Sequence, residues 1–436
     1  MTGNGRPGFQ YSPLEFVDAV ALRYSAAPPP AALRELPAGV AEIAFEVLNL
    51  LWLFGSLDAQ RRESWFRPDE FQSLEEEILA SSLDPPFRSA LGLIVGELVR
   101  PDDQTAALAQ GCAAAAEWAF DANAPETALA FLELSALAHP RSGRLALLAG
   151  RALKTHGKIR EAEYWLRRSG RLALIGRDWE TLVLSQHSLG VLYWNQGGIP
   201  RAERHLGRAL RYAKKNRLRG EIGAINHELF VVRVTSGKLE GVEEFAHAAF
   251  EHYLPDHPRL PHLAYDLSYY WLMRGYGHRV VPLFRELLPC FPEPAQRIQV
   301  LSAQARAAGA NGDRDSFAEA WAAAQPLLSN PAIQATRAAA LIDLGFGACH
   351  FALWPEACFC FAEAVKAAEA LGQHDLIIRA AACLERAESR DNPDTPVRPR
   401  TIAIGQNDAE RLAHAFLCVL SEFRASGDCG NGVAVH

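Results

Sequence analysis

The stretch SLGVLYWNQGGIPRAERHLGRAL, residues 188–210, contains two short apolar patterns on either side of a pair of glycines. Leu189 and Tyr193 lie four residues apart before the glycines, and Ala202 and Leu206 follow them with the same spacing. Residues at this interval share one face of an α-helix. Because glycine readily adopts the left-handed backbone conformation that ends a helix, the glycines predict a tight turn. The stretch therefore predicts two antiparallel helices that pack face to face.

The same pattern recurs along the chain. Gly157, Gly197 and Gly237 are spaced 40 residues apart, and each separates two helical apolar patterns. A fixed period of about 20–50 residues is typical of repeat architectures, in which each helix pair buries its apolar face against the next pair. Alanine, the strongest helix former, makes up roughly one residue in six, which favours close contacts between helices. These features predict an all-α chain of stacked helix pairs.

The residues of these pairs resemble the tetratricopeptide repeat (TPR) signature in order and in spacing. The landmarks are Leu189, Gly190, Tyr193, Gly197, Ala202, Leu206 and Ala209; Ala149, Gly150, Leu153, Gly157, Ala162 and Leu166; and Leu344, Gly345, Ala348, Ala357, Phe361 and Ala364. The resemblance implies a right-handed α-solenoid of about seven TPR-like helix pairs, which start near residues 109, 143, 183, 223, 263, 298 and 338. The match is weakest at 263, where Pro282 stands in the position of a small helical residue.

The predicted repeat array spans residues 109–387, and other segments flank it. Residues 1–108 predict a helical N-terminal region, either a cap or degenerate repeats, with helices at 14–24, 41–54, 69–80 and 87–99. Residues 388–406 are polar and contain several prolines, which predicts a linker. Helical apolar spacing over residues 407–424 predicts a C-terminal helix, and residues 425–436 predict a disordered tail.

The sequence contains no motif for nucleotide binding, hydrolysis or metal binding of the P-loop, dinucleotide, nucleophile-elbow or His-Glu-x-x-His kind. His252, His257 and His262 recur every five residues, a spacing that does not place three metal ligands on one helix face. A loop with exposed histidines is the preferred interpretation. We therefore predict a non-enzymatic protein with no catalytic residue, no metal and no cofactor.

The predicted localisation is cytoplasmic. The N-terminus lacks the charged and apolar regions of a secretory signal. The eight cysteines show neither a disulfide framework nor zinc-site spacing, which favours free thiols in a reducing compartment. The most apolar stretch, residues 47–55, is about half as long as a membrane span of roughly 20 residues, and predicts a buried helix with no membrane partner.

Positive charge is concentrated in one part of a chain whose net charge is −7. Residues 141–219 contain 18 Lys and Arg against 5 Asp and Glu, a local charge of +13 that leaves −20 for the remainder. Five cations recur at intervals of three and four residues along one predicted helix, opposite its apolar face: Arg201, Arg204, Arg208, Arg211 and Lys215. This convex basic stripe is one candidate partner-binding surface.

In the TPR family, ligands more often lie on the concave side, which the first helix of each repeat lines. Carried over to the matching positions of this sequence, the resemblance implies a second candidate surface: Arg144, Arg151, Lys154, His187, Val191, Trp194, Asn195 and His227. The Lys and Asn clamp with which some family members bind a C-terminal carboxylate is not reproduced here.

The resemblance implies a non-catalytic scaffold or adaptor that binds a protein or peptide. The basic region allows three interpretations: a solvated helix face, an acidic protein or peptide partner, and nucleic acid. Nucleic acid is the least favoured, because cationic surface alone supplies only non-specific binding. The alternative function is a ligand- or peptide-responsive regulator whose solenoid changes curvature on binding. Bacterial TPR regulators usually carry an N-terminal helix-turn-helix, which residues 1–108 do not clearly show.

Overall fold

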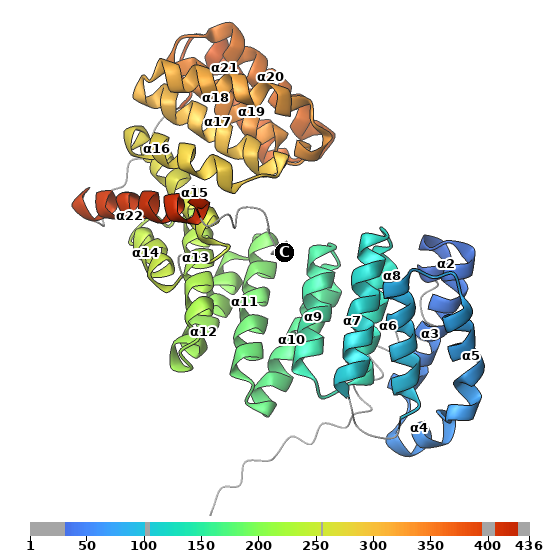
Figure 1. Ribbon diagram of the computed structural model, residues 1–436. Coiled ribbons are helices and arrows are strands. Elements are labelled where there is room, and N and C mark those ends of the chain that lie inside the picture. The colour runs from blue at the N-terminus through green and yellow to red at the C-terminus, as the bar shows by residue number, and fades with distance from the viewer. Residues whose placement is uncertain (1–30, 101–104, 254–255, 395–405, 426–436) are drawn as a thin grey trace, which may run out of the picture. The chain divides into compact units, whose positions relative to one another are not determined.

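A computed structural model describes residues 31–100, 105–253, 256–394 and 406–425 of the chain, and these residues form helices and turns without a β-strand (Figure 1). The helices divide into two compact bodies between Tyr212 and Ala213, within one helix. The N-terminal body contains α2 (Ala31–Glu35), α3 (Ala38–Ser56), α4 (Ala59–Trp65), α5 (Pro68–Ala80), α6 (Pro85–Leu98), α7 (Thr105–Asp121), α8 (Pro125–Ala138), α9 (Gly143–Thr155), α10 (Ile159–Gly176), α11 (Trp179–Asn195) and most of α12 (Ile199–Lys215).

The C-terminal body continues the helix pairs. It contains α13 (Arg219–Thr235), α14 (Val242–His252), α15 (Leu260–Met273), α16 (Gly277–Leu287), α17 (Pro294–Asn311), α18 (Arg314–Ala324), α19 (Arg337–His350), α20 (Trp354–Ala370), α21 (His374–Glu388) and α22 (Gln406–Ala425). Short 3₁₀ turns cover Leu288–Cys290, Gln325–Ser329 and Pro331–Ile333. A helix pair is present at each of the seven predicted repeat starts, with the odd-numbered helices α7 to α19 as the first helices.

Glycine turns join the two helices within repeats, as predicted. Gly157, Gly197 and Gly237 have φ angles of +71°, +74° and +72°, in the left-handed region that glycine enters without a steric penalty. Each follows the end of a first helix, at Thr155, Asn195 or Thr235. The three glycines spaced 40 residues apart therefore form equivalent turns in three repeats.

Small residues at the predicted landmarks allow the paired helices to approach closely. A Cβ atom at Gly190 of α11 would lie 2.6 Å from Leu206 Cγ of α12. Gly150 has the same relation to Leu166, and Gly345 to Phe361. The buried side chains around Gly190 include Leu189, Leu192, Tyr193 and Ala202. This packing of a glycine on the first helix against a large residue on the second is the arrangement that the sequence predicts.

The structure differs from the sequence-based expectation at several boundaries. Helix α16 forms although Pro282 lies inside it, and it is only 11 residues long. Helix α4 had no sequence prediction, and Asp58 caps it by accepting a hydrogen bond from the Arg61 amide. The predicted helix at 14–24 and the predicted tail beyond Ala425 lie outside the described residues. The predicted linker begins where α21 ends, and residues 395–405 of it also lie outside them.

Helix α3 is longer than the apolar stretch on which the expectation of no membrane segment rested. It has 19 residues, and among the described residues it is the one helix long and apolar enough, by length and composition alone, to cross a membrane. Ala41, Ala44, Val47, Leu48 and Leu51 are buried, and α3 packs against α2, α6 and α8.

The C-terminal helix α22 returns to the middle of the C-terminal body. It packs against α16, and its Phe416 ring lies 4.6 Å from the ring of Phe250 on α14. Leu412, Phe416 and Leu420 are buried in this contact region, which belongs to the core of the C-terminal body. The last helix therefore covers second helices of earlier repeats (Figure 1).

Candidate functional site

The predicted first-helix residues of the N-terminal body lie on α9 and α11. Arg151 Nε donates a hydrogen bond to Ser188 Oγ at 3.3 Å, which links the two helices. His187 is buried, whereas Arg144 and Asn195 are exposed. Lys154, Val191 and Trp194 are half-buried. These residues lie on adjacent first helices, α9 and α11.

The convex basic stripe lies on α12, and all five of its side chains are exposed: Arg201, Arg204, Arg208, Arg211 and Lys215. The opposite face of the helix buries Ala202, Leu206 and Ala209. The Arg201 guanidinium lies 5.6 Å from the centroid of the Tyr193 ring. Exposed positive charge of this kind suits long-range attraction of an acidic partner.

His205 lies among these cations. Burial and the nearby Arg208, Arg167 and Arg204 lower the pKa of His205 to about 4. The folded state therefore favours the neutral ring, whose Nδ1 donates a hydrogen bond to Gln186 Oε1 at 2.9 Å.

Acidification is therefore expected to destabilise the N-terminal body. In the unfolded chain, His205 is protonated below a pH of about 6.5, whereas in the folded chain it is protonated only near pH 4. The free energy of unfolding therefore decreases as the pH falls from about 6.5 to about 4. The expected loss is below about 1 kcal/mol, since the ring is half-exposed and solvent screens it. Urea denaturation at pH 7.5 and 5.5 measures it, and His205→Gln should lose this part of the pH dependence. An identical pH dependence in the variant would contradict the assignment.

His227, the predicted partner-binding residue on α13, contacts two polar side chains of neighbouring segments. His227 Nε2 lies 2.8 Å from Asp266 Oδ2, and its Nδ1 lies 3.3 Å from the Tyr253 hydroxyl. The His257 ring stacks on Tyr253 with centroids 4.0 Å apart. His262 instead packs edge-on against Phe291. Across the described residues, His, Cys, Asp and Glu form no group of three arranged for a metal ion.

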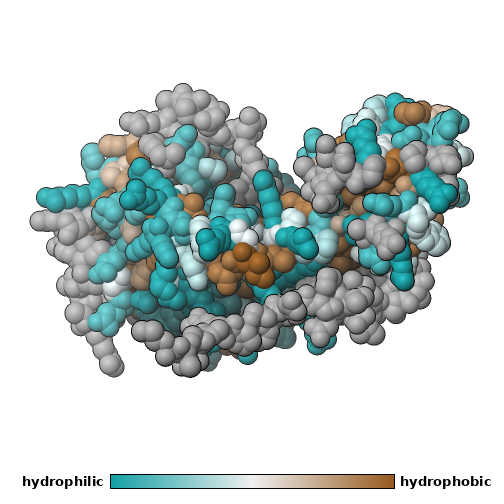
Figure 2. All heavy atoms as spheres, turned by 90° about the horizontal axis from the view of Figure 1, so that it is seen from below, coloured by the Kyte–Doolittle hydropathy of each residue, from teal (hydrophilic) through white to brown (hydrophobic). Residues whose placement is uncertain are grey.

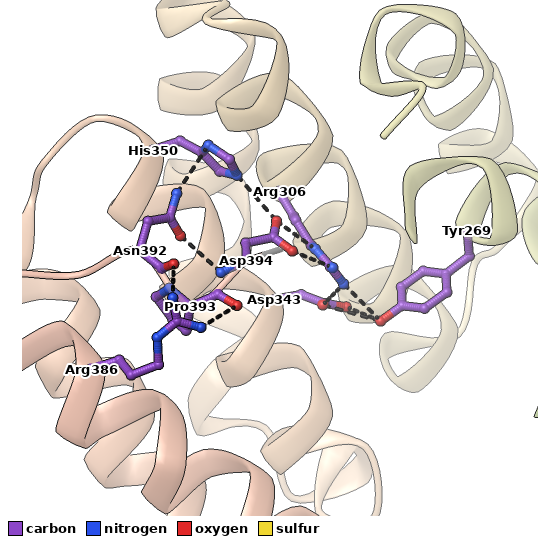
Figure 3. Close-up of polar contacts among 8 residues, drawn as sticks. All are labelled: Tyr269, Arg306, Asp343, His350, Arg386, Asn392, Pro393 and Asp394. Atoms are coloured by element: carbon purple, nitrogen blue, oxygen red, sulfur yellow. Dashed lines mark hydrogen bonds and ion pairs between the residues drawn. The ribbon is translucent and has the colours of Figure 1, made fainter. Parts of the chain in front are cut away.

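Sequence reasoning missed a polar network on the first helices of the C-terminal body (Figure 3). Its centre is Arg306 of α17, which is 5% exposed. Arg306 Nη1 donates to Asp343 Oδ1 of α19 at 3.0 Å and to the Tyr269 hydroxyl of α15 at 3.4 Å. The Tyr269 hydroxyl in turn donates to both oxygens of Asp343, at 3.1 and 3.0 Å. Three successive first helices are joined in this way.

A fourth member comes from the chain beyond α21. Asp394 accepts hydrogen bonds from Arg306 Nε at 3.0 Å and Nη2 at 2.5 Å, and from His350 Nε2 at 3.1 Å. Burial opposes the charge on Asp394, but the hydrogen bond from His350 and the charge and hydrogen bonds of Arg306 lower its pKa to about 2. Burial and the Asp343 carboxylate raise the pKa of Tyr269 to about 12. At neutral pH, Asp394 is therefore ionised and Tyr269 is a neutral donor.

Arg386 of α21 binds the residues that lead to Asp394. Its Nε donates to Asp391 Oδ2 at 2.6 Å, and its two terminal nitrogens donate to the backbone oxygens of Asn392, at 2.7 Å, and Pro393, at 3.3 Å. The Asn392 side chain accepts from the Asp394 amide at 2.9 Å. We call residues 391–394 the strap, because they connect Arg386 of α21 with Arg306 of α17 and His350 of α19 (Figure 3).

A cavity of about 290 Å³ lies beside the strap. Its lining combines three arginines with apolar side chains and the end of the strap: Met273, Arg306, Phe346, Arg379, Ala382, Cys383, Arg386, Pro393 and Asp394. The exposed Arg379 guanidinium lies 5.4 Å from the centroid of the Phe346 ring. Within the described chain Arg379 forms no ion pair. The cavity therefore offers a free cation beside an aromatic face.

A regular spacing of three polar residues is the sequence signal that could have indicated this network. Tyr269, Arg306 and Asp343 are spaced 37 residues apart, close to the repeat length, and they lie on the successive first helices α15, α17 and α19. Arg306 lies within an alanine-rich pattern, and its burial is not visible from sequence. The strap lies in the segment interpreted as a linker.

Hydrophobic surface is not concentrated at any of the predicted sites. Large exposed apolar side chains such as Trp65, Ile175, Phe359 and Ile378 come from different helices. On the face drawn in Figure 2, hydrophobic patches are surrounded by hydrophilic side chains. Charge and the cavity therefore distinguish the candidate surfaces better than hydrophobicity does.

No protein-family model matches the sequence, and no curated protein matches it significantly. Solved structures resemble its fold. The Rap conjugation gene regulator of the plasmid pLS20, in complex with the Phr* peptide, is 14% identical, with a TM-score of 0.38 over 79% of this chain and 96% of that one. A signal transduction ATPase with a TPR sensor from Pyrococcus horikoshii is 12% identical, with a TM-score of 0.46 over 95% and 67%. A Rap protein complexed with competence and sporulation factor is 10% identical, with a TM-score of 0.32 over 80% and 98%. At these values the likeness concerns helical repeats and says nothing of this chain's partner.

Proposed function

Since this chain folds into helix pairs of the tetratricopeptide repeat type, we propose that it is a non-catalytic cytoplasmic protein that binds an acidic peptide segment of a protein partner. The observation that carries the proposal is the cavity beside Arg379 of α21 and Phe346 of α19. An unpaired guanidinium over an aromatic ring attracts a carboxylate, and the apolar lining accepts an adjacent side chain.

The size of the cavity is compatible with the binding of part of a peptide. About 290 Å³ is at the lower limit of the roughly 300–1,000 Å³ of pockets that enclose a small ligand. It suits one or two side chains of a chain that continues along the surface. The strap supports this proposal, because Arg386 binds residues 391–393 beside the same cavity through three hydrogen bonds.

Charge reversal at the cavity is expected to weaken the binding of acidic peptides. An array of synthetic ten-residue peptides with varied Asp, Glu, Pro and aromatic content is probed with the wild type, Arg379→Glu and Arg314→Glu. We expect Arg379→Glu to lose on the order of tenfold in affinity for the acidic peptides, because it replaces an attractive contact with a repulsive one. Arg314, on the second helix α18, is a matched control. It is exposed, and its guanidinium also lies beside an aromatic ring, 5.5 Å from the centroid of Phe351.

Three outcomes would count against this site. The first is the absence of any acidic peptide that binds, and the second is an equal loss in Arg314→Glu. The third is unchanged binding in Arg379→Glu together with loss after charge reversal at Arg204, Arg208 and Arg211. That result would indicate that the peptide binds the basic stripe of α12 instead.

A further inference from the structure

The strap lies at the candidate site as a ligand would. After α21 the chain turns at Arg390, whose φ is +56°, and the Asp391 amide donates to the Arg386 backbone oxygen at 2.9 Å. Asn392 then accepts from the Asp394 amide, which fixes a local bend. The bend places the Asp394 carboxylate against Arg306 and His350, where it is 9% exposed.

Asp394 is not required to neutralise Arg306. Asp343 already gives Arg306 a buried carboxylate partner at 3.0 Å, from the adjacent first helix. The Arg306–Asp343 pair has no net charge, and Arg379 and Arg386 add two cations to the lining of the cavity. Without the strap the site is therefore a folded, positively charged pocket. With the strap in place, Asp391 and Asp394 supply the two anions that balance it.

The strap covers part of the pocket and leaves the rest open. Pro393 and Asp394 form one side of the cavity, while Phe346, Arg379 and Cys383 form the others. A peptide that brings its own carboxylate to Arg379 lies next to Asp394 and repels it. The same peptide can then pair with Arg386 and Arg306 as the strap leaves.

We propose that residues 391–394 are a built-in competitor for the acidic peptide site, so that a ligand must displace the strap by supplying carboxylates to Arg386 and Arg306. This inference rests on the proposed function and adds its regulation. An attached competitor acts at a high effective concentration, in the millimolar range for short connections. Acidic ligands of low affinity therefore do not displace the strap.

The test uses the full chain and a released variant, Asp391→Ala with Asp394→Ala. The probe is a fluorescein-labelled peptide with the sequence of residues 389–394, SRDNPD, and fluorescence polarisation measures its affinity. We expect the released variant to bind the probe at least about tenfold more tightly than the wild type does. Both probes are C-terminally amidated, and the probe SRNNPN, which then has no carboxylate, should bind neither the wild type nor the released variant. Glu388→Gln is the matched control, because Glu388 is exposed and close to the strap in sequence.

A second readout does not depend on a ligand. Cys383 lines the cavity and is 7% exposed, whereas Cys418 is exposed. The rate of N-ethylmaleimide alkylation at Cys383, relative to Cys418, should rise several-fold in the released variant and stay unchanged in Glu388→Gln. Melting curves verify that both variants fold.

Equal affinity of the wild type and the released variant for SRDNPD, binding by neither, or an unchanged alkylation rate would overturn the inference. Two further results distinguish a failure of this inference from a failure of the proposed function. If unrelated acidic peptides bind the wild type and the released variant equally, the competitor is rejected and the peptide site stands. If such peptides bind neither protein while SRDNPD binds the released variant, the strap is confirmed and the wider function is rejected.

Discussion

Gly347→Ala is expected to lower the free energy of unfolding of the C-terminal body by about 3 kcal/mol, the upper part of the range for overpacked sites. A Cβ atom at Gly347 of α19 would lie 2.8 Å from the Ala305 backbone oxygen and 3.0 Å from the Ala305 backbone carbon of α17. At the same crossing, a Cβ atom at Gly309 of α17 would lie 2.8 Å from the Gly347 backbone oxygen. Because the obstructing atoms are backbone, no side-chain rotation relieves the clash, and the two helices must separate.

Urea denaturation followed by circular dichroism measures this loss. Gly220→Ala is the matched control in the same body, because Gly220 lies within α13 and a Cβ there has no atom within 4 Å. Alanine is the better helix former, so the control should lose no stability. An unfolding midpoint of Gly347→Ala equal to that of the wild type would mean that α17 and α19 are farther apart than described.

Arg306→Met should destabilise the C-terminal body by about 3–5 kcal/mol, the usual cost of removing one partner from a buried ion pair. The variant leaves Asp343 and Asp394 buried without their shared cation. The triple variant Arg306→Met, Asp343→Asn, Asp394→Asn should recover a large part of the loss, because no charge remains unpaired. Failure of the triple variant to recover stability would mean that Arg306 acts through packing on Phe346, 4.5 Å from its guanidinium, more than through charge.

The pH dependence of Arg306→Met gives an independent measure. Burial already raises the pKa of Asp343. Without Arg306, the folded state binds protons at these carboxylates more tightly than the unfolded state does, so acidification stabilises the fold through them. The stability difference between the wild type and Arg306→Met should therefore be smaller at pH 5 than at pH 7.5. A constant difference would show that the carboxylates are not the source of the loss.

Local sequence predicted the helix pairs because turn and packing residues act over short distances. Gly197 ends a helix by its own backbone freedom, and Gly190 and Leu206 face each other within one repeat. The division between Tyr212 and Ala213 was not predictable in this way, because it falls within a continuous helical pattern. It depends on contacts among many helices.

The candidate site was harder to predict for the same reason. Arg306 and Asp394 are 88 residues apart, and their contact exists only once α17, α19 and α21 are stacked. The predicted first-helix positions came from one repeat each, so residues joined across several repeats did not stand out. The spacing of Tyr269, Arg306 and Asp343 was available in the sequence, but it has meaning only after the repeats are aligned.

The return of α22 to α14 and α16 has a consequence for how the C-terminal body unfolds. In an open repeat array each repeat touches only its neighbours, so the ends fray and unfolding spreads inward in steps. The contact between Phe250 and Phe416 joins an early repeat to the last helix. Closing this long loop slows folding, because its entropy is lost before the contact forms. In return, α14 and α16 cannot unfold without releasing α22, so these three helices should unfold together.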